Sequence, residues 1–324
     1  MPFPVSRPPD NFTSYPPRPT RGSAAEDLAH YFHPSTHWDS AWYDVKPQIP
    51  PPAMMKGDRC IISGRTLRWG GFETRVLLYG VFCRDLSVFW GELTIIGSEP
   101  SDPNKIGRSA RFLPCPQPLG KEALVEAHNA YGDGIASFAE RHIETQQYCG
   151  RGECWDLASK GLKHFEQFDH VEKPIQSISR THGHLIASFN AGARGVPTGM
   201  WRGGDDRVRR GDIVEWRNVK IRVKMRWGHG TAVLGNPDHT AIVVSDLVPG
   251  CPVKNEKRLE VAKFGTLEVA EQSMRAGELP KKEKYDLGRL EQGEVWIYRP
   301  IGMKNYIGTE FSKEYPKDVE TRSI

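Results

Sequence analysis

The chain has 324 residues, of which 38% are hydrophobic and 26% are charged, a balance that predicts a folded globular protein. Its net charge of +4 is too small to indicate nucleic-acid binding, and no apolar run approaches the roughly 20 residues that cross a bilayer. The N-terminus shows no secretory signal, and the six scattered cysteines predict neither a disulfide framework nor a zinc site. We therefore expect a cytoplasmic protein without a metal or cofactor.

Residues 1–30 are expected to form a disordered tail, because they are rich in proline, serine and arginine. Within this tail, Pro16–Arg21 fits the pattern PxxPxR, a polyproline-II ligand of Src-homology-3 domains. Short motifs of this kind are also common by chance. The segment is therefore either a ligand for a Src-homology-3 partner or a flexible tail.

Residues 31–120 form a β-rich N-terminal region, in which 75–82 and 87–96 have the composition of adjacent strands. A helical pattern follows over 121–144, with an expected break at Gly132–Gly134. A second helix is predicted over 154–168, and glycine-rich loops over 183–204. Further strands are predicted at 212–216, 219–227, 240–246, 266–272 and 294–298, before a C-terminal tail at 303–324.

These elements predict an α+β domain over residues 31–302, with a catalytic-like core at 121–302. In this fold the helix that begins at Cys154 packs on an antiparallel sheet. The strand Lys220–Trp227 alternates strictly between basic and apolar residues. Its basic face either deters edge pairing or docks an acidic protein or lipid headgroups.

Cys154 is the candidate nucleophile. The segment Gly150–Ala158 places this cysteine after a glycine-rich turn, at the first position of an amphipathic helix. The free N–H groups and the positive end of a helix stabilise a thiolate at that position. The alternative is a small cysteine packed beside Trp155.

His239 is the candidate base, since it precedes the apolar run Thr240–Val244, which predicts a rigid strand. His229, ten residues earlier, is the main rival. A cysteine at a helix start, followed by a histidine at a strand start, is the order that papain-like thiol hydrolases use.

A third group should orient the imidazole. Alternation along Leu267–Ser273 places Glu271 and Ser273 on one face, so that Glu271 would accept the second imidazole N–H and Ser273 could assist. The alternative is that Glu271 is a solvated strand carboxylate. An oxyanion hole would combine the Cys154 N–H with an upstream donor, for which Gln146, Gln147 and Tyr148 are candidates.

Four segments together resemble the cysteine proteinase-fold domain family of the fungal myosin tail region-interacting proteins. They are Gly152–Ala158, Arg210–Val214, Pro237–Val243 and Glu271–Ser273. The resemblance runs from about residue 70 to 302, in the order of the family. More distantly, the same series is similar to the CHAP and NlpC-type amidohydrolases of the papain-like class. The CHAP pattern ends in Glu-Gln-Asn, where this chain has Ser273.

The resemblance implies a papain-like fold with Cys154 as nucleophile, His239 as base and Glu271 as the orienting residue. It also implies an adaptor setting at cortical actin patches of the cell cortex. Two functions follow as hypotheses: a thiol hydrolase that cleaves an amide or isopeptide bond of a protein or peptide, or a non-catalytic protein-binding scaffold module. A redox-sensing pair of Cys149 and Cys154 is a third hypothesis.

Overall fold

The computed structural model describes residues 22–44, 49–52, 55, 60–69, 73–83, 85–97, 102–103, 105–192, 196–225, 228–312, 314–316 and 322–323. The chain divides into two compact units: residues 1–117 with 304–324, and residues 118–303. The end of the chain, expected as a tail, therefore groups with the N-terminal unit. No helix of the described residues is long and apolar enough to cross a membrane.

The N-terminal unit combines a short helix with an antiparallel sheet. Helix α1 (Ala24–Phe32) packs Leu28 and Phe32 against Trp38 and Phe89. The sheet has the order β1-β2-β3-β4-β13, with bounds Cys60–Trp69, Glu73–Phe82, Val88–Ile96, Gly107–Leu113 and Arg322–Ser323. The pairing of β2 with β3 confirms the two strands expected from sequence. Helix α4 spans Met303–Ile307.

Helix α1 lies inside the segment 1–30, for which we expected disorder. The hydroxyl of Ser23 caps this helix by accepting a hydrogen bond from the Glu26 N–H at 3.2 Å. Leu28 is fully buried, so the apolar face of α1 orders this segment by packing. The Pro16–Arg21 motif lies outside the described residues.

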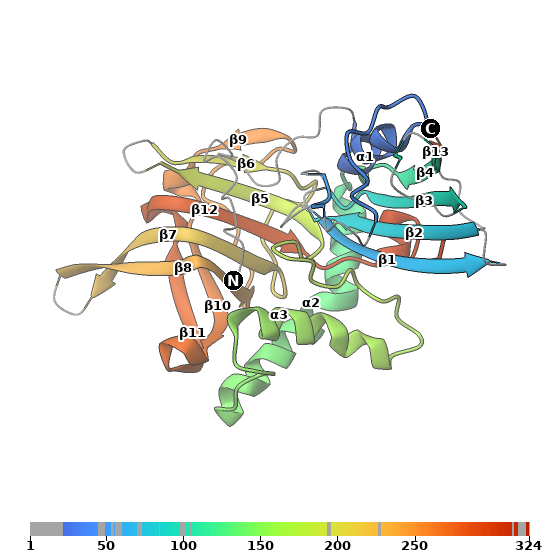
Figure 1. The fold of residues 1–324 in the computed structure, drawn as a ribbon. Helices are drawn as coiled ribbons and strands as arrows, with labels where there is room; N and C mark the ends of the chain where they lie inside the picture. Colours follow the sequence, from blue (N-terminus) through green and yellow to red (C-terminus); the bar gives the residue numbers. More distant parts are fainter. Residues whose placement is uncertain are drawn as a thin grey trace. The chain divides into compact units, whose positions relative to one another are not determined.

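The second unit holds an eight-stranded antiparallel sheet with helices packed on it (Figure 1). The strand order is β11-β10-β8-β7-β12-β5-β6-β9. In that order the bounds are Glu278–Asp286, Thr266–Ser273, Gly228–Val243, Ile213–Met225, Leu290–Arg299, His184–Ala191, Thr198–Trp201 and Lys257–Leu259. The expected α+β class, with antiparallel strands, is confirmed.

Helices α2 (Lys121–Thr145) and α3 (Cys154–Lys163) lie side by side, and the 3-10 turn η3 (His164–Gln167) follows α3 (Figure 1). The α3 helix packs Leu157 and Leu162 against Ile213, Ile242 and other apolar residues of the sheet. The opposite side of the sheet carries the larger core, which includes Trp216 and Val243. The expected packing of the Cys154 helix on an antiparallel sheet is therefore present.

The expected break at Gly132–Gly134 is wrong, since α2 is continuous through these residues. Gly132 is instead a point of close approach between α2 and the turn at Arg210–Gly211. A Cβ at Gly132 would lie 2.7 Å from the Arg210 carbonyl oxygen. Tertiary packing, rather than a helix end, thus explains this glycine.

Two other expectations differ from the structure. Residues 183–204, expected as loops, contain β5 and β6, which pair with each other from Ala187↔Trp201 to Asn190↔Thr198. The two strands expected at 212–216 and 219–227 are one strand, β7, whose register with β8 shifts between Arg217 and Val219. A bulge therefore lies where the two expected strands were separated.

The alternation expected for residues 220–227 holds for the part of β7 whose side chains are described. Lys220 and Arg222 are exposed, whereas Val219 and Ile221 are buried. Arg222 donates a hydrogen bond to Glu291 Oε1 at 2.9 Å.

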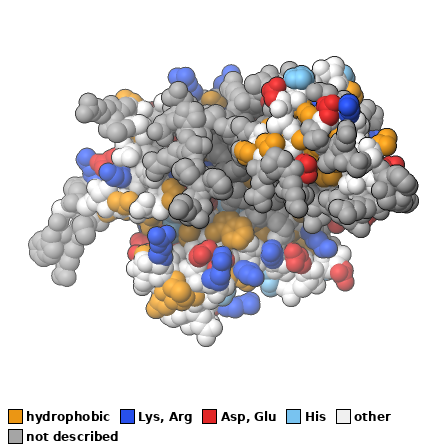
Figure 2. Space-filling model, viewed as in Figure 1, with side chains coloured by type: hydrophobic (Ala, Val, Ile, Leu, Met, Phe, Trp, Pro, Cys, Tyr) orange, Lys and Arg blue, Asp and Glu red, His pale blue; other side chains and the backbone are white. Residues whose placement is uncertain are grey.

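In the lower part of Figure 2, where α2 and α3 lie, cationic and anionic side chains are interspersed.

Candidate active site

A tight glycine turn leads into α3 and places Cys154 at its first residue. Gly150 and Gly152 have positive φ values of 58° and 82°. A Cβ at Gly150 would lie 2.9 Å from Asp156 Cγ, and the Asp156 carboxylate accepts the Arg151 N–H at 2.7 Å. The side chain of Asp156, in the first turn of α3, therefore stabilises the turn that precedes this helix.

Glu153 precedes the thiol, and a carboxylate there would oppose a thiolate if it faced the sulfur. Its side chain makes no capping hydrogen bond to α3. Instead, Glu153 pairs with Arg151 at 3.0 Å and is 59% exposed. Solvent and a cation therefore offset its charge.

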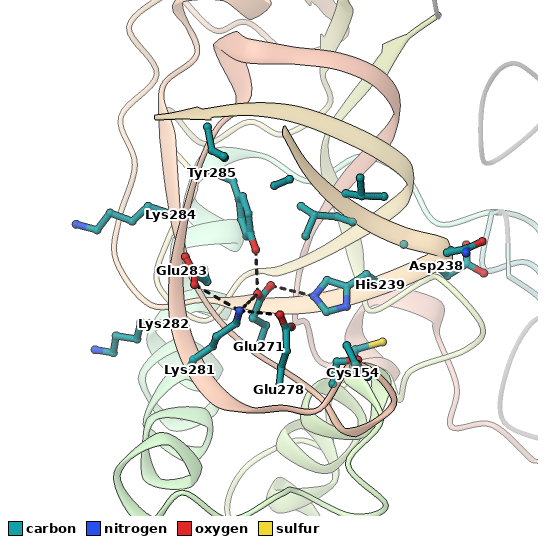
Figure 3. A pocket seen from close by; sticks show the side chains of 18 of the residues that line it. Cys154, Asp238, His239, Glu271, Glu278, Lys281, Lys282, Glu283, Lys284 and Tyr285 are labelled. Atoms are coloured by element: carbon teal, nitrogen blue, oxygen red, sulfur yellow. Dashed lines mark hydrogen bonds and ion pairs between the residues drawn. The ribbon is translucent and has the colours of Figure 1, made fainter. Parts of the chain in front are cut away.

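His239 and Glu271 form the centre of the site (Figure 3). His239 lies on β8 and Glu271 on β10, which pairs with β8 through Ala270↔Ile242 and Val269↔Val243. Nε2 of His239 is 2.9 Å from Glu271 Oε2. Glu271 is 2% exposed, so the alternative of a solvated strand carboxylate is excluded.

Three influences set the pKa of His239. Burial lowers it, but a hydrogen bond with Cys154 and the interaction with Glu271 outweigh burial and raise the pKa to about 10. Cys154 and Glu271 together thus favour the cationic form of the ring, and Cys154 lines the same cavity as His239. Because Nε2 faces Glu271, Nδ1 is the nitrogen left for the thiol.

Glu271 stays anionic although it is buried. Burial raises its pKa, but hydrogen bonds with His239 and Tyr285 and the charge of Lys281 give a net lowering. The Tyr285 hydroxyl donates to Glu271 Oε1 at 2.9 Å, and Lys281 Nζ lies 3.8 Å from the same oxygen (Figure 3). Sequence reasoning missed Tyr285, because β11 is too rich in charge to be recognised as a strand.

Gln272 is a second residue that sequence reasoning did not single out. Its side chain is fully buried; Oε1 accepts the Cys149 N–H at 2.8 Å, and Nε2 donates to the carbonyls of Cys149 at 3.0 Å and Glu153 at 2.8 Å. Gln272 therefore fixes both ends of the turn before Cys154. The sequence signal that could have found Gln272 is the alternation of side chains along the strand, which places Gln272 on the face opposite to Glu271.

A cavity of about 1390 Å³ opens at this site, and its lining includes Cys154, His239, Glu271 and Ser273. The Ser273 hydroxyl accepts the Ala276 N–H at 3.3 Å and so caps the 3-10 turn η5 (Met274–Ala276). Gln147 and Tyr148 are not among the lining residues. The structure thus brings together the predicted Cys, His and Glu, but not the predicted oxyanion donors.

The other candidates have different surroundings. Gln146 ends α2 in a left-handed conformation, and its Nε2 donates to the carbonyls of Ile143 and Pro280. His229 pairs with Lys224 near the far end of β8, on the order of 30 Å of strand from His239. Cys149 is buried and its Sγ donates to the Asp156 carbonyl at 3.7 Å, while burial raises its pKa to about 11.

Comparison with known proteins agrees with this geometry. The chain is 29% identical, over 226 residues, to the protein named "Altered inheritance of mitochondria protein 3" from Debaryomyces hansenii. That match covers 67% of this chain but only 21% of the relative, so the chain spans about a fifth of that protein's length. No solved structure matches the chain significantly. The family model described as the AIM3/BBC1 cysteine proteinase-fold domain matches residues 109–311, more than half of the chain, and the protein belongs to this family.

Proposed function

We propose that this protein is a papain-like thiol hydrolase, similar in its site to CHAP and NlpC-type enzymes, that cleaves an amide or isopeptide bond. The observation that carries the proposal is the gathering of three residues in one cavity. Cys154 at the start of α3 lines the cavity together with His239, and His239 is 2.9 Å from the buried Glu271.

Each residue has a role in the proposed reaction. The Cys154 thiolate attacks the carbonyl carbon, and the imidazolium of His239 gives its proton to the departing amine, so that a thioester remains. Neutral His239 then takes a proton from water, which attacks the thioester and releases the acid and the thiol. Glu271 holds the imidazole in place and balances its positive charge.

The backbone N–H of Cys154 is the proposed oxyanion donor, since it lies at the N-terminus of α3. Gln147 or Tyr148 would supply a second donor only if the turn before Cys154 rearranged, and Ser273 would support the turn from β10. Peptidase, amidase and acyltransferase activity use the same acyl-enzyme, since they differ only in the acyl acceptor.

The test is the rate of Cys154 alkylation by iodoacetamide at pH 6, followed by peptide mass spectrometry in the wild type and in His239→Ala. An ordinary thiol, with a pKa of about 8.5, is less than about 1% ionised at this pH. We expect labelling that is on the order of a hundredfold slower in the variant. Equal slow rates in both proteins would refute an activated cysteine.

The second candidate function is a non-catalytic binding module, associated with cortical actin patches. Its support is the match to a longer relative, in which the matched region makes up only 21% of the protein. On this hypothesis a Src-homology-3 domain would bind Pro16–Arg21, and the binding would be insensitive to Cys154→Ser. Titration of an isolated Src-homology-3 domain with the protein, and with a Pro19→Ala variant, tests this alternative.

A further inference from the structure

The cavity beside Cys154 is bounded by a strand edge that no other described strand covers. β8 pairs with β7 along its length, from Met225↔Gly228 to Ile213↔Ile242. On its other side, β8 pairs with β10 only at Ile242 and Val243. The edge from Ala232 to Leu234 therefore has no partner strand among the described residues, and it lines the cavity.

This edge leads to His239 across an irregular stretch of β8 at residues 235–237. Asp238 and His239 follow on the same strand and line the same cavity, which continues to Cys154 (Figure 3). The strand carries Val233, which is 63% exposed, beside the partly buried Ala232. An edge with an exposed apolar side chain and free backbone groups is a template for another extended chain.

The opposite wall of the cavity carries charges of both signs, and several of them are paired with one another. Lys281 lies 3.1 Å from Glu278, Lys284 lies 3.5 Å from Glu268, and Arg289 lies 3.1 Å from Asp286. The wall therefore presents no excess of one sign to a ligand. Recognition by charge, as for a phosphate or a strongly acidic peptide, is not what this cavity is built for.

The size of the cavity also bears on its ligand. Its volume of about 1390 Å³ exceeds the roughly 300–1,000 Å³ of sites for small molecules. A strand rises about 3.3 Å per residue, so several residues of an extended chain can lie along β8 before the carbonyl that reaches Cys154.

We infer that the substrate is an extended, unfolded stretch of polypeptide that adds to the free edge of β8 through main-chain hydrogen bonds. This inference rests on the proposed function, because it names the substrate class of the same site. It selects a flexible tail or an unfolded segment over a folded surface or a small amide. Side chains of the substrate then matter less than its ability to form a strand.

The binding experiment uses full-length Cys154→Ala, so that it does not depend on catalysis. Its probe is fluorescently labelled, reduced and carboxymethylated lactalbumin, which is permanently unfolded; native lactalbumin and acetylglutamine amide are the controls. We expect the unfolded probe alone to raise fluorescence anisotropy, and to slow hydrogen–deuterium exchange in peptides that contain Ala232–Leu234. Equal binding of folded and unfolded probes, or binding without this protection, would overturn the inference.

Two proline variants, Ala232→Pro and Val233→Pro, make the test specific to the backbone. Because N–H groups alternate along a strand, one variant removes a bond to β7 and the other removes a donor that faces the cavity. Circular dichroism and thermal melting identify the variant that keeps the fold. That variant should bind the unfolded probe at least tenfold more weakly, and unchanged affinity would contradict strand addition.

The outcomes separate this inference from the proposed function. Rapid labelling of Cys154 at pH 6 without edge binding would keep the thiol hydrolase and overturn the extended substrate. Edge binding with slow labelling would support strand addition by a protein that is not a hydrolase.

Discussion

At the scale of single residues, the site depends on the buried charges of His239 and Glu271. His239 would be neutral if burial acted alone, but Cys154 and Glu271 reverse this effect and raise its pKa to about 10. Glu271 in turn keeps its charge because His239, Tyr285 and Lys281 surround it. Cys154, His239 and Glu271 are therefore electrostatically interdependent, and a change at one should alter the other two.

The first prediction concerns the pH dependence of stability. The pKa of His239 is raised in the folded state, so its contribution is complete below the unfolded pKa of about 6.5 and is lost as the pH rises through about 10. The free energy of unfolding of wild type minus that of His239→Gln should fall by on the order of 4 kcal/mol from pH 6 to pH 10. Urea unfolding of both proteins at each pH measures this, and a constant difference would contradict a raised pKa.

Gln272 gives a second prediction. Replacing it by alanine leaves the Cys149 N–H and the carbonyl of Glu153 without their buried partner. Each unsatisfied group costs about 1–3 kcal/mol, so Gln272→Ala should lower the free energy of unfolding by about 2–4 kcal/mol and slow Cys154 labelling. Gln147→Ala, at an exposed position of the same loop, is the control. Loss of stability in the control, or its absence in Gln272→Ala, would argue against this role.

At the scale of elements, the packing of α2 on the turn before β7 explains two glycines. The Gly132 site in α2 faces Arg210 and Gly211, and Gly211 has a φ of 88°. The Arg210 side chain then ties the turn to α2 through Asp133 at 3.1 Å and through Glu140. Close backbone contact and ion pairs thus both hold α2 against the turn at Arg210–Gly211.

The third prediction follows from the close contact between Gly132 of α2 and the turn at Arg210. Alanine normally stabilises the middle of a helix by about 1 kcal/mol relative to glycine. A Cβ at Gly132 would instead meet the Arg210 carbonyl oxygen at 2.7 Å, so Gly132→Ala should destabilise the protein by about 1–3 kcal/mol. Asn129→Ala, at an exposed position of α2, should be neutral or slightly stabilising. Thermal melting of both variants decides, and a stabilised Gly132→Ala would contradict the close contact.

How far sequence predicts these elements depends on where their determinants lie. Cys154 and His239 could be found because a glycine turn before a helix and a β-branched run after a histidine are local signals. The continuity of α2 through Gly132 could not be predicted. The reason for this glycine is its contact with the turn at Arg210, 78 residues further along the chain. Likewise Lys281 and Lys284 of β11 lie near Glu271 and Glu268 of β10, and these partners become visible only when β10 and β11 are paired.

At the scale of the whole molecule, residues 118–303 hold a complete core as well as the site. Among the described residues, two apolar clusters lie wholly within 118–303, and a third lies within residues 24–112. Cys154, His239 and Glu271 all belong to the second unit. A folded site should therefore not require the N-terminal unit.

The fourth prediction tests this division. A fragment of residues 118–303 should unfold cooperatively in urea and should keep the Cys154 labelling rate of the full chain within about twofold. Circular dichroism and iodoacetamide labelling measure the two properties. An unfolded fragment would mean that residues 304–324 or the N-terminal unit contribute essential stability.

The adjacency of Glu271 and Gln272 on β10 has a consequence for sequence change. Successive side chains of a strand point to opposite faces, so Glu271 bonds to His239 while Gln272 fixes the turn before Cys154. Deletion or insertion of one residue within β10 would exchange these faces and disrupt both contacts together, whereas a change of two residues would restore the parity. Among relatives of this chain, the two contacts should therefore be inherited, or lost, as a single trait.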